Sequence, residues 1–150
     1  MAPLEKNEIC EIEITDLGTD GEGIGRIRGF TVFVPGGLPG ERLSVKILKV
    51  KKSFAYGKLL EILAPSPSRV APPCPYYGAC GGCNILHMNY PAQLRFKAKR
   101  IKDALERIGG FRDIDVPVVG MDEPFHYRNK AQFPLSKENG QVKIGFYSPR

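Results

Sequence analysis

The chain has 150 residues, of which 42% are hydrophobic and 25% are charged, and its formal net charge is +6. This apolar content is too high for a disordered chain, and the length suits one domain or two small ones. No stretch approaches the roughly 20 apolar residues that span a bilayer, and the N-terminus lacks the hydrophobic segment of a secretory signal. We therefore expect a folded, cytoplasmic protein with no membrane association.

The positive charge is concentrated in one part of the chain. Residues 1–63 carry nine basic and nine acidic side chains, whereas residues 64–110 carry seven basic and only two acidic ones. A local basic excess of this kind is the electrostatic signature of a polyanion partner. Solvated lysines with no partner would give the same count, so charge alone leaves both interpretations open.

The first sixty residues alternate between apolar and polar side chains, which is typical of half-buried strands. We expect strands over residues 8–15, 30–34, 41–50 and 54–63, with turns and bulges in the glycine-rich segment 18–25. Cys10 shares an apolar face with Ile12 and Ile14, which favours a core position over a ligand role. Leu43, Val45, Ile47 and Lys49 share a face in the same way. Four or five short strands predict a small OB-like antiparallel β-barrel.

Basic and aromatic side chains are interleaved in this predicted barrel. Small open barrels bind oligonucleotides through cationic and stacking side chains on one face. Many barrels also expose lysines without any binding role. The candidate RNA-binding residues of this region are Arg26, Lys49, Lys51, Lys52 and Phe54.

Three of the four cysteines, Cys74, Cys80 and Cys83, lie within ten positions in a C-x5-C-x2-C arrangement. Clustered thiols in a cytosolic chain indicate metal binding or redox chemistry rather than disulfides. Four thiolates usually hold an iron–sulfur cluster, whereas three cysteines with His87 would suit zinc. From spacing alone both metals stay open, as do an unligated loop and a fourth ligand from His87, Cys10 or beyond this sequence.

The second half of the chain predicts a mixed α+β region. Residues 64–73 are rich in proline and are expected to be a linker. Apolar residues at intervals of three or four predict a helix over 91–108 with a basic face that includes Arg100. Residues 116–119, 127–135 and 141–147 are expected to be strands, and the Asn139-Gly140 pair predicts a hairpin turn.

These motifs together resemble a known family. A barrel containing GEGIGR and FVPGGLPGE, the cysteine motif and then FHYRNKAQ resembles the TrmA/RumA-like RNA uracil-5-methyltransferases. The resemblance implies a TRAM domain at 1–63, a linker at 64–73, a [4Fe-4S]-binding segment at 74–90 and an incomplete central RNA-binding domain at 91–150. It also implies RNA contacts by Arg128 and Lys130, and a fourth cluster cysteine beyond residue 150.

The same resemblance places the S-adenosylmethionine site and all catalytic residues in a Rossmann-like domain that this sequence lacks. We therefore expect the RNA-recognition and cluster-bearing portion of an S-adenosylmethionine-dependent uracil-C5 methyltransferase, inactive alone. Its partner would be RNA, ribosomal RNA in preference to tRNA, and no protein partner is evident. The alternatives are a non-catalytic RNA-binding module with a Cys3His zinc site, and a barrel with an inert cysteine loop.

Overall fold

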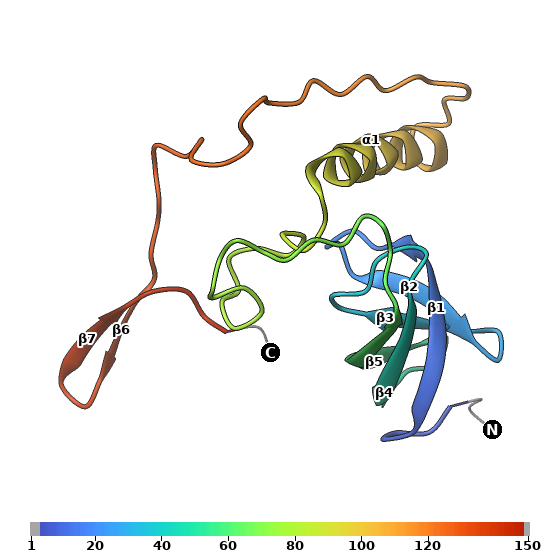
Figure 1. Cartoon of the computed structure of the whole chain (residues 1–150), viewed down its shortest axis with the longest axis horizontal. Helices are drawn as coiled ribbons and strands as arrows, with labels where there is room; N and C mark the ends of the chain where they lie inside the picture. The colour runs from blue at the N-terminus through green and yellow to red at the C-terminus, as the bar shows by residue number, and fades with distance from the viewer. Residues whose placement is uncertain (1–3, 149–150) are drawn as a thin grey trace.

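The computed structural model describes residues 4–148 and gathers five strands into a closed barrel (Figure 1). The strands are β1 (Ile9–Leu17), β2 (Gly23–Ile27), β3 (Phe30–Val34), β4 (Arg42–Val50) and β5 (Phe54–Ala64). Their order around the barrel is β1-β2-β3-β5-β4, and β4 pairs with β1 to close it. Only β3 and β5 run parallel within this barrel. The predicted fold class, a mainly β chain with an OB-like barrel, is confirmed.

The interior of the barrel is filled by side chains at alternating strand positions. Ile12 and Ile14 of β1 are buried, as are Leu43 and Val45 of β4. Their two-residue period predicted this arrangement, because successive side chains of a strand point to opposite faces. Cys10 lies partly buried against the same core, which agrees with its predicted packing role.

A β-bulge in β4 turns Lys49 away from the core. The register of β4 against β5 shifts between Ile47 and Lys49, and Lys49 is exposed opposite Tyr56. An extra residue in one strand reverses the alternation that follows it. The prediction that Lys49 shares the inner face of β4 is wrong for this reason.

The glycine-rich segment 18–25 forms a turn only in its first part, because β2 begins at Gly23. Gly25 lies buried opposite Ile14 of β1. A Cβ atom at Gly25 would lie 2.2 Å from the carbonyl oxygen of Glu13. Glycine therefore allows two strands to approach closely here. Local sequence does not distinguish a glycine in this role from a glycine in a turn.

Helix α1 (Tyr90–Arg107) starts at a capping residue. The side chain of Asn89 accepts a hydrogen bond from the backbone N–H of Ala92 at 3.0 Å, and Pro91 occupies the first turn. An N-cap asparagine satisfies one of the N–H groups that a helix leaves without an internal partner. The predicted helix is confirmed to within one residue at each end.

Only one end of the apolar stripe of α1 is covered. Ala92 and Phe96 pack with Leu38 and Met88 in a second small core between the helix and the barrel. Farther along α1, Ile101 is exposed. No helix in residues 4–148 has the length and apolar character needed to cross a membrane.

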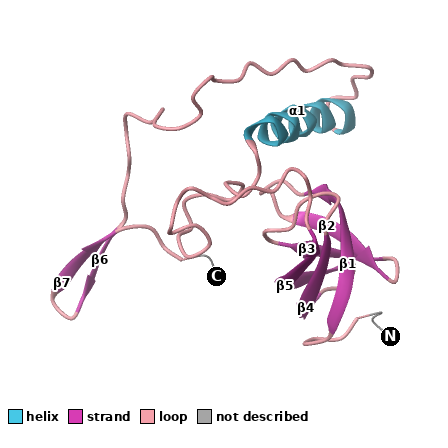
Figure 2. Cartoon of the chain, viewed as in Figure 1, coloured by secondary structure: helices cyan, strands magenta, loops and turns pink. Residues whose placement is uncertain are grey.

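The chain after α1 is mostly irregular, as the long loop in Figure 2 shows. Residues 116–119 and 127–134 form no strand, so both of those strand predictions are wrong. The hairpin prediction is confirmed: β6 (Leu135–Glu138) pairs with β7 (Gln141–Ile144), and Asn139 and Gly140 both have positive φ in the turn. Every residue of β6 and β7 is exposed.

Candidate functional site

The outer surface of the barrel brings together side chains from three strands. Phe33 of β3 pairs with Tyr56 of β5, and Tyr56 pairs on its other side with Lys49 of β4. One step farther along, Lys46 of β4 pairs with Lys58 of β5. This surface is called the aromatic–basic face here, and it consists of Phe33, Lys46, Lys49, Phe54, Tyr56 and Lys58.

The three rings of the aromatic–basic face contact one another. The ring centroids of Phe33 and Phe54 are 5.5 Å apart, those of Phe54 and Tyr56 are 5.4 Å apart, and those of Phe33 and Tyr56 are 6.0 Å apart. The first two pairs meet edge to face, at 89° between their planes. The Tyr56 side chain is exposed, so an aromatic surface is open to solvent. Such a surface can stack an unpaired base of a single-stranded nucleic acid.

Basic side chains surround these rings. Lys46 and Lys58 lie directly opposite each other, and like charges at paired strand positions destabilise a sheet. An anionic partner would relieve that repulsion. Lys51 and Lys52 are exposed in the β4–β5 turn, where the N–H of Lys51 donates to the carbonyl of Phe54 at 2.8 Å.

Five predicted RNA-binding residues therefore gather on this side of the barrel. Arg26 of β2 is exposed and pairs with Thr31 of β3, which in turn pairs with Phe54. Phe33 is a member that sequence reasoning missed, because its position depends on the parallel pairing of β3 with β5. No local pattern indicates such a pairing. The five predicted residues on this side are Arg26, Lys49, Lys51, Lys52 and Phe54.

The other three predicted RNA-binding residues lie on different elements. Arg100 is exposed on α1, with its guanidinium 5.8 Å from the ring centroid of Phe96. Arg128 lies 5.9 Å from the ring centroid of Tyr127 in the irregular segment before β6, and Lys130 is exposed in the same segment. Their role as RNA contacts stays a prediction.

The cysteine segment is a chain of tight turns. The N–H of Cys80 donates to the carbonyl of Tyr76 at 2.8 Å, and the N–H of Gly82 donates to Sγ of Cys80 at 3.4 Å. Cys74 and Cys83 are exposed, Cys80 is partly buried, and all are free thiols. Within residues 4–148, no three cysteine, histidine or acidic side chains converge in an arrangement that could hold a metal ion.

The donor types in this segment are those that both iron–sulfur clusters and zinc sites use. Three thiols on one accessible loop are the donors that iron–sulfur clusters use, and an amide N–H to a ligand sulfur is a common tuning contact. His87 is buried, and its Nδ1 contacts the hydroxyl of Tyr77. Cys10 belongs to the barrel, where burial and then Glu8 raise the pKa of its thiol.

The contact between Tyr77 and His87 is compatible with one tautomer of the imidazole. The Tyr77 hydroxyl donates to the carbonyl of Asn84 at 2.9 Å, so its single proton is used there. Both contacts are satisfied when His87 donates through Nδ1, which makes its Nε2 an acceptor. Nε2 is buried and has no hydrogen-bond partner among the described residues. Burial, and then the charge of Arg69, lowers the pKa of His87 to about 4.

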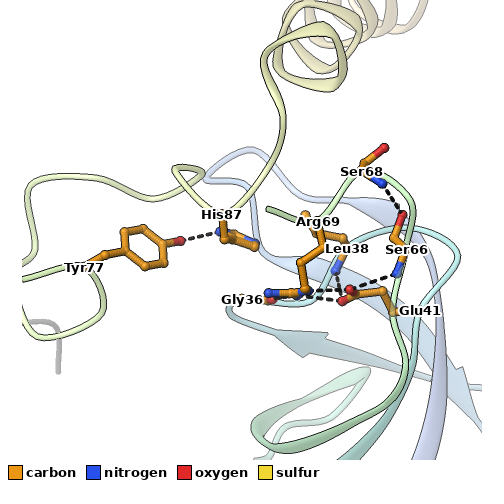
Figure 3. Close-up of polar contacts among 8 residues, drawn as sticks. All are labelled: Gly36, Leu38, Glu41, Ser66, Ser68, Arg69, Tyr77 and His87. Atoms are coloured by element: carbon orange, nitrogen blue, oxygen red, sulfur yellow. Dashed lines mark hydrogen bonds and ion pairs between the residues drawn. The ribbon is translucent and has the colours of Figure 1, made fainter. Parts of the chain in front are cut away.

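A buried ion pair joins the barrel to the segment that leads to the cysteines (Figure 3). Glu41 is fully buried, and its carboxylate accepts from Nε and Nη2 of Arg69 at 2.5 and 2.7 Å. The backbone N–H groups of Leu38 and Ser66 also donate to it, at 2.9 and 3.2 Å. Burial alone would raise the pKa of Glu41, but these hydrogen bonds and the charge of Arg69 together lower it.

Comparison with known proteins first defines the class of the barrel. Residues 3–60 match the TRAM domain. The match covers nearly all of the five strands and the whole aromatic–basic face. The TRAM domain predicted for this region from its motifs is thereby confirmed.

Beyond the barrel, nearly the whole chain is similar to proteins named RNA methyltransferases. It is 53% identical over 99% of its length to one from Clostridium tetani, and 47% identical over 99% to one from Halalkalibacterium halodurans. The chain spans about a third of these relatives' length, 32% and 33%. The resemblance to the TrmA/RumA-like RNA methyltransferases is confirmed.

A solved structure supports the same relationship. The Pyrococcus abyssi tRNA (uracil-54, C5)-methyltransferase, in complex with S-adenosyl-L-homocysteine, matches with a TM-score of 0.57 and 30% identity. The match covers 90% of this chain and 28% of that one. The similarity therefore includes the cysteine segment and α1 as well as the barrel.

Proposed function

We propose that this chain is the RNA-recognition part of an RNA uracil-C5 methyltransferase that uses S-adenosylmethionine. The observation that carries the proposal is the aromatic–basic face, where the exposed ring of Tyr56 and the part-buried rings of Phe33 and Phe54 lie among lysine side chains on a TRAM barrel. Lysines attract the phosphate backbone, and the rings stack unpaired bases. The similarity to proteins named RNA methyltransferases supports the reaction class.

The methyl transfer itself is assigned to sequence outside these 150 residues. The solved relative is a uracil-C5 methyltransferase in complex with S-adenosyl-L-homocysteine, which supports both the uracil C5 target and the cofactor. We assign no catalytic residue to this chain and expect it to be inactive by itself. Its role is to hold the RNA for a catalytic domain in the remaining two thirds of a protein of the relatives' length.

For the cysteine segment we propose a [4Fe-4S] cluster held by Cys74, Cys80 and Cys83. Support comes from the soft thiolate donors on one turn-rich loop and from the N–H of Gly82 beside Sγ of Cys80. A fourth cysteine would come from outside this sequence. Such a cluster would have a structural role, because a methyl transfer from S-adenosylmethionine requires no electron from a redox centre. That role would be to organise the RNA-binding lobes. Free thiols at all four cysteines suit the reducing cytoplasm.

The division of labour along the chain follows from these assignments. We propose an RNA-binding TRAM barrel at 1–63, a connector at 64–73, a cluster segment at 74–90 and the beginning of a second RNA-binding unit at 91–150. In that second unit Arg100, Arg128 and Lys130 would contact the RNA backbone. The solved relative is named for tRNA, which makes tRNA the first RNA to test beside the ribosomal RNA predicted from the sequence.

The test measures the affinity of the chain for a fluorescently labelled single-stranded RNA at several salt concentrations. We expect the double variant Lys51→Gln/Lys52→Gln to bind more weakly and to reduce the slope of log K against log salt by about 1.4, at about 0.7 for each lost contact. Lys6→Gln/Arg42→Gln removes the same charge at exposed positions outside the aromatic–basic face and should keep the slope. An unchanged slope in the first variant, or no RNA binding at all, would overturn the proposal.

A further inference from the structure

A hollow of about 750 Å³ lies between the barrel and the cysteine segment. Phe33 and Tyr56 line it from the barrel, and Tyr77 and Cys80 line it from the opposite segment. Asp20, in the β1–β2 turn, lies at the same hollow. Its size is within the range of roughly 300–1,000 Å³ that is usual for small-molecule sites. The aromatic–basic face therefore continues into a groove, which is called the Tyr56 groove here.

The walls of the Tyr56 groove are held in place by contacts on both sides. Tyr77 is fixed by His87 and by the carbonyl of Asn84. Gly21, which also lines the groove, has a φ of +85° and is packed so tightly that a Cβ atom there would lie 2.3 Å from Cγ2 of Ile85. These contacts order Tyr77 and the β1–β2 turn that carries Asp20, which lowers the entropic cost of binding a ligand.

The polar groups of the Tyr56 groove favour a nucleic-acid base over a phosphate. The carboxylate of Glu22 accepts a hydrogen bond from the backbone N–H of Asp20 at 3.0 Å. No hydrogen bond to the Asp20 carboxylate occurs among the described residues, and that side chain is exposed. Two carboxylates repel a phosphate, so the backbone of an RNA would stay on the lysines while a base enters the groove.

We propose that the Tyr56 groove binds an unstacked guanine of single-stranded RNA, with its ring on Tyr56 and its Watson–Crick edge on Asp20. Guanine presents two neighbouring donors on that edge, N1–H and the N2 amino group, which match the two oxygens of one carboxylate. Adenine and cytosine place an acceptor beside their amino group, and uracil flanks its single N–H with two carbonyls. The inference rests on the proposed RNA binding and adds the base that this site selects.

The experiment compares labelled hexauridines that carry one central guanosine, inosine or adenosine, each bound to the complete 150-residue chain. We expect the guanosine oligonucleotide to bind about tenfold tighter than the inosine one, because inosine lacks only the N2 amino group. Asp20→Asn should remove this preference while binding of plain hexauridine changes less than twofold. Asp122→Asn, which alters an exposed carboxylate outside the groove, should retain the preference.

A second measurement tests stacking on Tyr56. With a fluorescent guanine analogue that keeps both N1–H and the N2 amino group as the central base, binding should quench its fluorescence, and Tyr56→Leu should restore most of the emission. Phe111→Leu serves as the control at an exposed ring elsewhere. Equal affinity for guanosine and inosine, or quenching that survives Tyr56→Leu, would overturn the groove assignment. If hexauridine still binds in a salt-dependent way in that case, the proposed RNA binding stands and only this inference fails.

Discussion

Glu41 and Arg69 are 28 positions apart in the sequence, yet the fully buried carboxylate of Glu41 accepts hydrogen bonds from both Nε and Nη2 of Arg69, whose side chain is 20% exposed. Nη2 of Arg69 also donates to the carbonyl of Gly36 at 2.6 Å. The pair therefore attaches the proline-rich segment to two turns of the barrel. Residues 64–73, which composition predicts to be a linker, are anchored at this point.

Arg69→Met should strongly destabilise the chain, because it leaves the Glu41 carboxylate buried without its cation. Breaking a buried ion pair in this way costs about 3–5 kcal/mol. Urea unfolding measures the change. Arg42→Met is the matched control, since Arg42 is 63% exposed and only 3.8 Å from an exposed Glu11, and it should cost less than about 1 kcal/mol. Equal losses in the two variants would show that the buried pair contributes nothing special.

The stability of the chain should fall as the pH is lowered from 6.5 to 4. Burial lowers the pKa of His87 to about 4 in the folded state, so between these values the unfolded chain binds more protons than the folded one. Stability then rises with pH across this window, by on the order of 3 kcal/mol in total. The measurement is the urea midpoint at a series of pH values.

The pH dependence can be assigned to His87 by substitution. His87→Gln should flatten the dependence between pH 4 and 6.5, whereas His126→Gln, at the exposed histidine, should leave it unchanged. Glu41 contributes to the pH dependence in a more acidic range. Because its pKa is lowered in the folded state, Glu41 stabilises the folded chain fully at pH values above its ordinary pKa. This stabilisation is lost as the pH falls through the folded-state pKa. A wild-type slope in His87→Gln would contradict the assignment.

Metal analysis distinguishes the proposed cluster from zinc. Anaerobic reconstitution, with iron and sulfide, of a longer protein that contains this chain and the proposed fourth cysteine should give a coloured protein whose iron and acid-labile sulfide are lost in Cys80→Ser. Cys10→Ser should keep both, because Cys10 belongs to the barrel core. A colourless protein with one zinc that is lost in His87→Gln would favour the Cys3His site instead.

Asn89→Ala should destabilise helix α1 by about 1 kcal/mol, since it removes the acceptor for the N–H of Ala92. Asn89 also receives support from the preceding segment, where its own N–H donates to the carbonyl of Ser68 at 2.8 Å. Lys97→Ala changes an exposed position of the same helix and should have little effect. Hydrogen exchange of the first turn of α1 measures the difference, and equal protection in both variants would disprove the capping role.

Local patterns in the sequence predicted most of the regular elements. The alternation at Ile12 and Ile14 predicted β1, the apolar spacing before Gly109 predicted α1, and Asn139 with Gly140 predicted the hairpin. These features are encoded by neighbouring residues, because side-chain direction repeats every two residues in a strand and every 3.6 in a helix. The strand predictions for 116–119 and 127–135 lacked this support, since residues 116–119 and 127–134 have no partner strand in the described part of the chain.

Most of the site was decided by tertiary structure. The lysines and Phe54 could be named from composition, but their arrangement around Phe33 and Tyr56 depends on a parallel pairing between distant strands and on the bulge at Lys49. The buried pair of Glu41 and Arg69 likewise depends on a contact that closes a long loop. By itself the sequence determined the barrel, the helix and the cysteine spacing, because those follow from local periodicity and residue type. Only the folded chain decided which rings and charges share a surface, because contacts between distant residues leave no periodic signal.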